Sequence, residues 1–310
     1  MQGKGTDEGG ADRFGRVGSP ETEPVITEEV ATGVPDDAND LRGHHFSRLI
    51  RTPLTLILAG ALTAAVFVVC LISIGAAIGA GAALVTVLLA TVVVFVIADH
   101  RAANDFFEVY AASRGLNLVS ERGRLPQATP LLRKGDDRYA ERSMTGRLAD
   151  GVHGTLALFT YEEETTNSDG QSETNYYRYT VGFTQVTECA ERVPELYCQR
   201  KFGLRSLEKF EDVFRTRKAR VKLESEVLDK KYEIFAGTEQ DAVWLRRLFS
   251  PTFIVWLTDS APSKFAFELV DGNLCCYVGG HKENAEDLDG VAAATGAVAT
   301  RLREEALEGS

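Results

Sequence analysis

The sequence has few cysteines, fewer bases than acids, and one long apolar run rather than several. Five cysteines in 310 residues are too sparse for a small domain framed by disulfides. The 34 Lys and Arg residues against 45 Asp and Glu residues give a net charge of −11. That charge disfavours a generally basic nucleic-acid binder, so we predict no nucleic-acid partner. A single apolar block leaves no room for the many spans of a polytopic transporter.

Motifs of well-known catalytic centres are also missing. The sequence contains neither G-x-x-x-x-G-K-[ST] nor a G-x-G-x-x-G that opens a helix after a strand. It has no H-E-x-x-H and no G-x-S-x-G. Cys275, Cys276 and His281 lack the paired C-x-x-C spacing of zinc sites, and we read these cysteines as buried thiols. We therefore predict no cofactor, no metal and no catalytic residue, and we lean against an enzyme.

The charge is distributed unevenly along the chain. Residues 1–41 contain three bases and ten acids, so they carry −7 of the total charge of −11. They hold few large apolar side chains, which predicts a disordered acidic tail. We read this tail as a passive, solvating segment, with partner binding as the alternative. Residues 52–98, by contrast, contain no charged residue at all.

This uncharged run predicts a helical hairpin in a membrane. As one helix, residues 52–98 would be about 70 Å long, whereas the core of a bilayer is about 30 Å thick. The small-residue stretch Gly75–Gly81 allows a tight reversal. We therefore predict spans at 53–74 and 80–98. A cleaved signal peptide is disfavoured because the run starts late and a second apolar run follows directly.

Basic residues flank the outer ends of both predicted spans but are missing from the reversal between them. Arg42, Arg48 and Arg51 precede it, Arg101 follows it, and the reversal contains no Lys or Arg. Since basic flanks stay in the cytoplasm, we predict a multi-pass protein of the cell membrane with both termini cytoplasmic and the lipid bilayer as a partner. Neither span contains an ionisable residue, which disfavours a proton relay or an ion pathway.

Residues 101–310 are long enough for one folded domain with a sizeable core. The expected elements are strands at 154–162 and 175–186, a short helix at 204–214, a helix capped by Thr238, a hairpin at 264–270 and 273–278, and a long helix at 285–306. Between the first two strands, the polar stretch 165–174 predicts an exposed loop. Strands and helices do not alternate regularly. The predicted fold class is therefore a membrane-anchored α+β protein, with a transmembrane hairpin followed by a cytoplasmic domain that has an antiparallel sheet.

One segment resembles a known family. Residues 224–232 read E-S-E-V-L-D-K-K-Y, and the chain continues through D-A at 241–242 and L-F-S-P at 248–251 to W-L at 256–257. This resembles a family of uncharacterised bacterial membrane-anchored proteins with two transmembrane helices and a cytoplasmic α+β domain. The resemblance implies that architecture but no activity. The residues we expect to pack or cap are Tyr232, Phe235, Leu245 and Trp256 as core, and Glu224 and Ser225 as a turn or cap.

A basic cluster is the one candidate site in the sequence. Its members are Arg215, Arg217, Lys218, Arg220 and Lys222. Such a patch can contact anionic lipid headgroups or a protein partner. The alternative is a solvated strand or loop whose bases pair with Glu224, Glu226 and the acids at 208–212.

Taken together, these features predict a membrane-tethered cytoplasmic module that binds or organises a protein partner of unknown identity. The alternative is a membrane-tethered enzyme with an unrecognised active site. A deep pocket with converging carboxylates or histidines would favour the enzyme, and a shallow surface would favour the binding module.

Overall fold

The computed structural model describes residues 101, 103–166, 170–201 and 218–308, with Val85, Leu88 and Val92 as single helical positions. All of them belong to the larger of the two compact units of the chain, Val34–Ser310. The expected acidic tail at 1–41 and the expected helix at 204–214 lie outside the described residues.

Residues 103–113 form a helix, and strands and helices follow it in mixed order. The strands are β1 (Asn117–Val119), β2 (Asp137–Ala149), β3 (Val152–Thr166), β4 (Ser172–Gln185), β5 (Glu195–Arg200), β6 (Lys218–Val221), β7 (Tyr232–Gly237), β8 (Ala266–Val270) and β9 (Asn273–Gly279). The helices are α4 (Pro130–Arg133), α6 (Glu226–Lys231), α7 (Ala242–Leu248), α8 (Pro251–Val255) and α9 (Ala285–Glu308), with a short 3₁₀ turn at Thr187–Cys189 and a π-helical turn at Trp256–Ser260.

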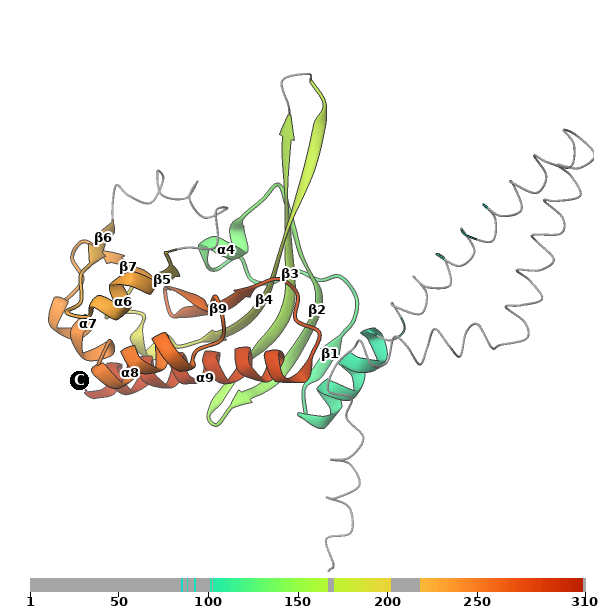
Figure 1. Ribbon diagram of the computed structural model, residues 1–310. Helices are drawn as coiled ribbons and strands as arrows, with labels where there is room; N and C mark the ends of the chain where they lie inside the picture. Colours follow the sequence, from blue (N-terminus) through green and yellow to red (C-terminus); the bar gives the residue numbers. More distant parts are fainter. Residues whose placement is uncertain are drawn as a thin grey trace, which may run out of the picture. The chain divides into compact units, whose positions relative to one another are not determined.

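The described strands form one sheet in the order β1-β2-β3-β4-β9-β8-β5-β7-β6, and every pairing is antiparallel. β1 to β4 run as a meander, and the β8–β9 hairpin lies between β4 and β5 (Figure 1). Asp271 and Gly272 connect β8 to β9 with φ angles of 47° and 74°. A two-residue turn with positive φ at both positions fits the twist of a hairpin, which confirms the turn predicted here.

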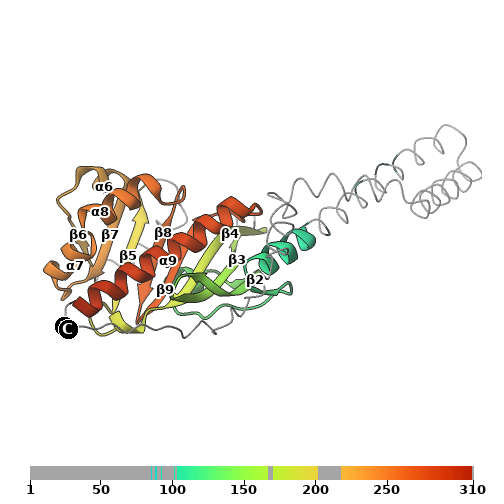
Figure 2. The same ribbon diagram turned by 90° about the horizontal axis from the view of Figure 1, so that it is seen from below.

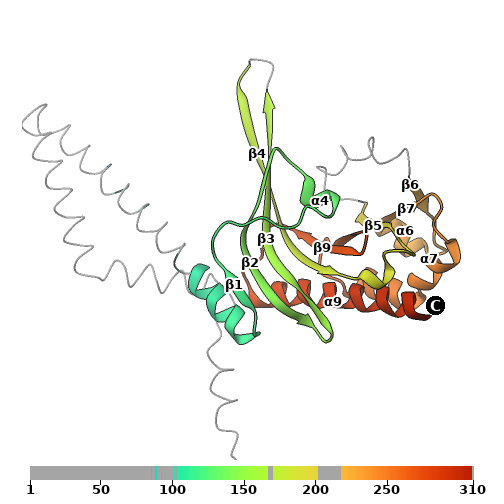
Figure 3. The same cartoon turned by 180° about the vertical axis from the view of Figure 1, so that it is seen from behind.

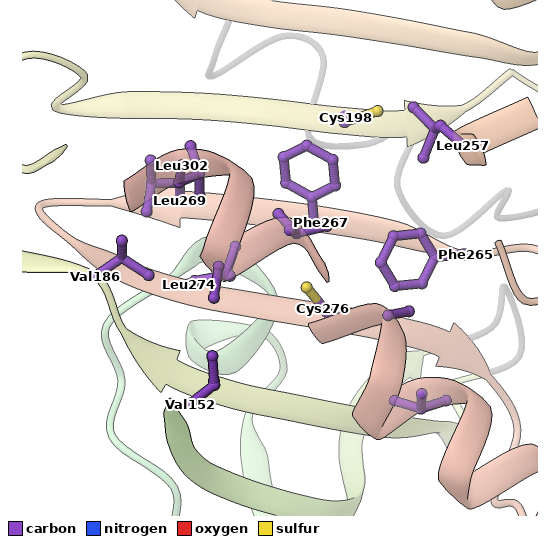
Figure 4. Packing of buried hydrophobic residues seen from close by; sticks show 14 of the residues in the cluster. Val152, Val186, Cys198, Leu257, Phe265, Phe267, Leu269, Leu274, Cys276 and Leu302 are labelled. Carbon is purple, nitrogen blue, oxygen red and sulfur yellow. The ribbon is translucent and has the colours of Figure 1, made fainter. Parts of the chain in front are cut away.

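One face of the sheet packs against α9, which crosses several strands (Figure 2). Leu288, Val291, Val298 and Leu302 are buried on α9 at helical spacing. Phe267 of β8 and its neighbours on β9 belong to the same buried cluster (Figure 4). The C-terminal helix predicted at 285–306 is thus confirmed, and its apolar stripe forms one wall of the main core.

The helix at 103–113 is fixed to the same face. Phe106, Phe107 and Tyr110 are buried in the main core. The Tyr110 hydroxyl donates a hydrogen bond of 2.8 Å to Asp289 on α9, and Arg114 binds the same carboxylate with Nε at 2.6 Å. Burial and the hydrogen bond to Asp289 raise the pKa of Tyr110 far above its usual value. The phenol therefore stays a donor, and it holds this helix to α9.

The opposite face of the sheet carries a second, smaller core under α4. Leu131 and Leu132 of α4 pack with Phe159, Tyr179 and Tyr277 on the strands. β3 is therefore buried on both faces between residues 156 and 161. Burial on both faces explains why this strand reads as an unbroken apolar run instead of alternating.

The membrane-anchored fold class and the multi-pass membrane location predicted from the sequence are corrected by the structure. Among the described residues, no helix is both long and apolar enough to cross a membrane. α9 has 24 residues, but it carries charged side chains near both ends. The spans expected at 53–74 and 80–98 lie outside the described residues, apart from Val85, Leu88 and Val92. The fold class that replaces the prediction is a nine-stranded antiparallel sheet with helices.

Of the two helix caps predicted from the sequence, one is confirmed and one is wrong. Ser225 caps α6, since its side chain accepts a hydrogen bond from Leu228 N, and this confirms the expected cap. Thr238 does not cap α7. That helix begins after Asp241, whose carboxylate accepts from Val243 N. Asp241 is the better acceptor, and the helix starts where its carboxylate can reach a free N–H group.

Candidate interaction site

The hairpin of β3 and β4 extends beyond both neighbouring strands. The two strands pair from Gly154↔Thr184 to Thr166↔Ser172. β2 accompanies β3 only as far as Asp137↔Glu162, and β9 accompanies β4 only as far as Tyr179↔Gly279. We call residues 162–166 and 170–178 the arm, and it projects from the sheet in Figures 1 and 3. The structure thus corrects the loop expected at 165–174, because both ends of that stretch are paired strand.

Stacked tyrosines anchor the base of the arm. The ring centroid of Tyr161 lies 4.8 Å from that of Tyr177 and 5.9 Å from that of Tyr179, and both pairs are stacked. Tyr179 meets Tyr277 edge to face at 5.9 Å. Tyr161 and Tyr179 are almost fully buried. Each such aromatic pair stabilises by about 0.5–1.5 kcal/mol beyond its buried area, so the first residues of the arm are fixed on the sheet.

The β3 edge of the arm is capped near its base. Asp136 N donates to Glu162 O at 2.8 Å, and Glu164 N donates to the carboxylate of Asp136 at 2.9 Å. The Tyr139 hydroxyl donates to Glu162 Oε1 at 3.0 Å. Burial and this hydrogen bond raise the pKa of Tyr139 to about 12, so the phenol stays protonated at neutral pH. A strand added on this side would have to displace Asp136.

The β4 edge of the arm is open. The last backbone bond between β4 and the chain after β9 runs from Gly280 N to Arg178 O at 2.8 Å. Ladder groups alternate in direction along an antiparallel strand. The N–H and C=O groups of Tyr176, Thr174 and Ser172 therefore point away from β3. These three residues are exposed, and their outward groups make no hydrogen bond to the described residues.

The arm is acidic. Its described residues include four acids, Glu162, Glu163, Glu164 and Glu173, and one base, Arg178. None of the four carboxylates forms an ion pair with a described residue. Among the described residues, the site therefore combines an open strand edge with carboxylates that form no ion pair. The sequence carried one weak signal for it, since Thr174, Tyr176 and Tyr177 are residue types favoured in strands, but the polar composition of residues 165–174 favoured a loop.

A buried carboxylate lies under α4. Glu268 on β8 is fully buried, and its Oε2 accepts from Leu131 N at 2.9 Å. Burial, with a contribution from the charge of Glu268, raises the pKa of Cys275 and of Tyr277 well above their usual values. Both groups therefore stay neutral. Because no solvent reaches Glu268, we read it as the group that holds α4 on the sheet.

His281 is a second polar residue to consider, and it lies beside Phe159 and Thr160 of β3. Its Nε2 lies 3.2 Å from Phe159 O and 3.2 Å from Thr160 Oγ1. A carbonyl only accepts, so we assign the proton to Nε2. That nitrogen cannot then take a proton from Thr160, whose hydroxyl lies 3.5 Å from Glu141 Oε1. The arrangement positions the 280–284 segment and does not form a nucleophile with its base.

The basic cluster predicted from the sequence is only partly described. Arg215 and Arg217 lie outside the described residues, whereas Lys218 and Arg220 belong to β6 and Lys222 follows it. Arg220 forms an ion pair of 3.3 Å with Glu233, a partner that the sequence did not suggest. Lys222 is exposed, and β6 is the last strand of the sheet order. Its described members Lys218, Arg220 and Lys222 thus lie at the end of the described sheet order, five strands away from β4.

The four described cysteines do not form a site. Cys189, Cys198, Cys275 and Cys276 are all buried free thiols. Cys275 belongs to the core under α4 and Cys276 to the core under α9, so the two point to opposite faces as expected. Within the described part of the chain, no group of three His, Cys, Asp or Glu residues is arranged to hold a metal ion.

No family model, no curated protein and no solved structure matches this chain. The resemblance of residues 224–257 to membrane-anchored bacterial proteins stays a prediction. The function has to be argued from the geometry of the arm.

Proposed function

We propose that the chain is a binding module in which the β4 edge of the arm takes up an extended, basic segment of a protein partner as an added strand. The observation that supports this proposal is the open edge at Ser172, Thr174 and Tyr176. An unpaired strand edge is a ready template for another chain, and strand addition is a common way in which proteins recognise extended peptides.

The arm is suited to this role because it is ordered before the partner arrives. The ladder with β3 and the stacked tyrosines at its base fix the backbone of β4. The partner therefore bears most of the ordering cost of association, and a rigid receiving strand lowers the total cost of binding.

The charge of the arm selects the partner. Four carboxylates against one guanidinium favour a segment rich in Lys or Arg. The same charge repels the phosphates of nucleic acids. An acidic strand edge therefore favours a basic polypeptide over RNA or DNA.

A labelled peptide of alternating Lys and Val, seven residues long, tests the proposal. Its binding to the full chain is measured by fluorescence anisotropy, with a Glu–Val peptide of the same length as the control. Thr174→Pro removes one outward N–H and is compatible with an edge strand. We expect this variant to bind the Lys–Val peptide at least about tenfold more weakly, which is about 1.4 kcal/mol.

Thr174→Val is the matched variant, since it changes the side chain but keeps the N–H group. We expect it to bind the Lys–Val peptide as the unmodified chain does. Equal binding by Thr174→Pro and Thr174→Val, or equal binding of the two peptides, would contradict strand addition on an acidic edge.

A further inference from the structure

β6 has the properties that the arm requires of its partner. Residues 218–222 read K-A-R-V-K, so charged and apolar side chains alternate and no acid is present. β6 pairs with β7 on one side only, and it is the terminal strand of the described sheet. No described strand pairs with its other edge.

Arg220 and Lys222 of this segment are available for a new contact. Lys222 is exposed, and the side chain of Arg220 is 41% exposed although it pairs with Glu233. An ion pair this exposed is weak, because water and salt screen it. Arg220 can therefore exchange Glu233 for a carboxylate of the arm at little cost.

The arm cannot reach β6 of its own chain. Five strand-to-strand steps separate β4 from β6, through β9, β8, β5 and β7. At about 4.8 Å a step, this is a lateral distance of about 24 Å. The arm continues along the direction of β4 and not across the sheet, so any pairing between the two edges joins different molecules.

Resting on the proposed function, we infer that the partner is a second copy of this chain, whose β6 segment 218–222 adds to the β4 edge of the arm. The arm contributes four acids and one base, and the β6 segment contributes three bases. Pairing of two arms is disfavoured, because each arm carries four acids against one base and the two would bring like net charge together. Pairing of the arm of one copy with β6 of the other brings opposite net charges together.

Charge-reversing substitutions in differently tagged full-length copies test this inference. The arm-reversed chain carries Glu163→Lys, Glu164→Lys and Glu173→Lys. The β6-reversed chain carries Lys218→Glu, Arg220→Glu and Lys222→Glu. Two tagged copies are co-expressed in one host, one tag is captured, and the amount of the other tag is measured.

We expect unmodified copies to co-purify, and we expect recovery to decrease with rising salt concentration. Two arm-reversed copies, and likewise two β6-reversed copies, should lose at least tenfold in recovery. An arm-reversed copy mixed with a β6-reversed copy restores opposite charges at both contacts, so recovery should return. A variant that merely misfolds cannot produce this rescue.

The inference is overturned if unmodified copies do not co-purify, if neither reversal lowers recovery, or if the mixed pair is not rescued. Binding of the Lys–Val peptide separates this failure from failure of the proposed function. If copies do not associate but the peptide binds and Thr174→Pro weakens it, the module takes another basic partner. If the peptide does not bind either, the proposed function fails as well.

Discussion

The β3–β4 hairpin forms one continuous backbone ladder, but its two halves lie in different environments: one is buried in the sheet and the other is largely exposed. Between residues 156 and 161, β3 lies inside the sheet and is buried on both faces. Beyond Glu162 the same strand, still paired with β4, has exposed or half-buried side chains and no further strand beside it. The pairing of the two strands is continuous, whereas the apolar packing against the rest of the sheet ends at Tyr161 and Tyr177.

This difference separates what holds the hairpin from what the hairpin can do. The half of the hairpin that lies inside the sheet is stabilised by burial on both faces. Its backbone groups are hydrogen-bonded to neighbouring strands on both sides. Beyond the contacts of Asp136, Tyr139 and Tyr161 at its base, the arm has only the cross-strand ladder among the described residues. That ladder leaves one set of N–H and C=O groups on β4 without described partners. Substitutions in the inner half should therefore change the free energy of unfolding, and substitutions in the arm should change binding.

The largest contrast is expected for truncation of a side chain in each half of β3. Phe159→Ala removes a ring that is 1% exposed, and we expect it to lower the free energy of unfolding by about 3–5 kcal/mol. Glu164→Ala, five residues further along the strand, should change it by less than about 0.5 kcal/mol. Urea denaturation of the two variants gives both values, and similar losses would mean that the arm is packed as tightly as the sheet.

A glycine of β4 gives a contrast of intermediate size. A methyl group added at Gly182 would overlap the Thr295 hydroxyl on α9, whereas nothing lies within 4 Å of a methyl added at Gly237 on β7. We expect Gly182→Ala to cost about 1–3 kcal/mol through overpacking. Gly237→Ala should be neutral within about 0.5 kcal/mol. If Gly182→Ala and Gly237→Ala shift the melting temperature and the urea midpoint by the same amount, α9 does not lie as close to β4 as described.

The smallest effect concerns pH at the foot of the arm. Burial lowers the pKa of His281 below its ordinary 6.5, although Phe159 O and Glu141 act in the opposite direction. The unfolded chain then takes up the proton at a higher pH than the folded chain. The stability that His281 contributes is therefore complete above about pH 6.5, and it is lost as the pH falls through the folded-state pKa.

The free energy of unfolding should fall between pH 7 and pH 5 by at most about 1.4 kcal/mol per pH unit from this group. His281→Gln should flatten that slope. An equal slope in the unmodified chain and in His281→Gln would show that the imidazole is not buried as a neutral group.

Local sequence signals predicted the parts of the fold that local physics decides. The apolar run at 155–161, the Asp271-Gly272 turn and the apolar stripe of the last helix were sufficient for β3, the β8–β9 hairpin and α9. The order of strands across the sheet was not predictable in this way. Insertion of β8 and β9 between β4 and β5 depends on contacts between residues that are distant in the chain.

The candidate site was harder to predict for a related reason. Residues 165–174 are polar, and polar composition normally indicates a loop. The pairing of Thr165 and Thr166 with Glu173 and Ser172 continues a ladder that buried residues have already started, so little further stabilisation is needed. The open edge at Thr174 and Tyr176 follows from the point at which β9 ends, which the sequence does not reveal. The basic cluster was found by its charge, but its place at the sheet edge was not.

Hydrogen exchange at single amides of β4 tests the central claim most directly. In the free chain, the outward amides of Thr174 and Tyr176 should exchange rapidly, whereas the inward amides of Asn175 and Tyr177 should be protected by the ladder with β3. Addition of the Lys–Val peptide should protect Thr174 and Tyr176 and leave Asn175 unchanged. Protection of Thr174 and Tyr176 in the free chain, or no change when the peptide is added, would contradict an open edge that receives a strand.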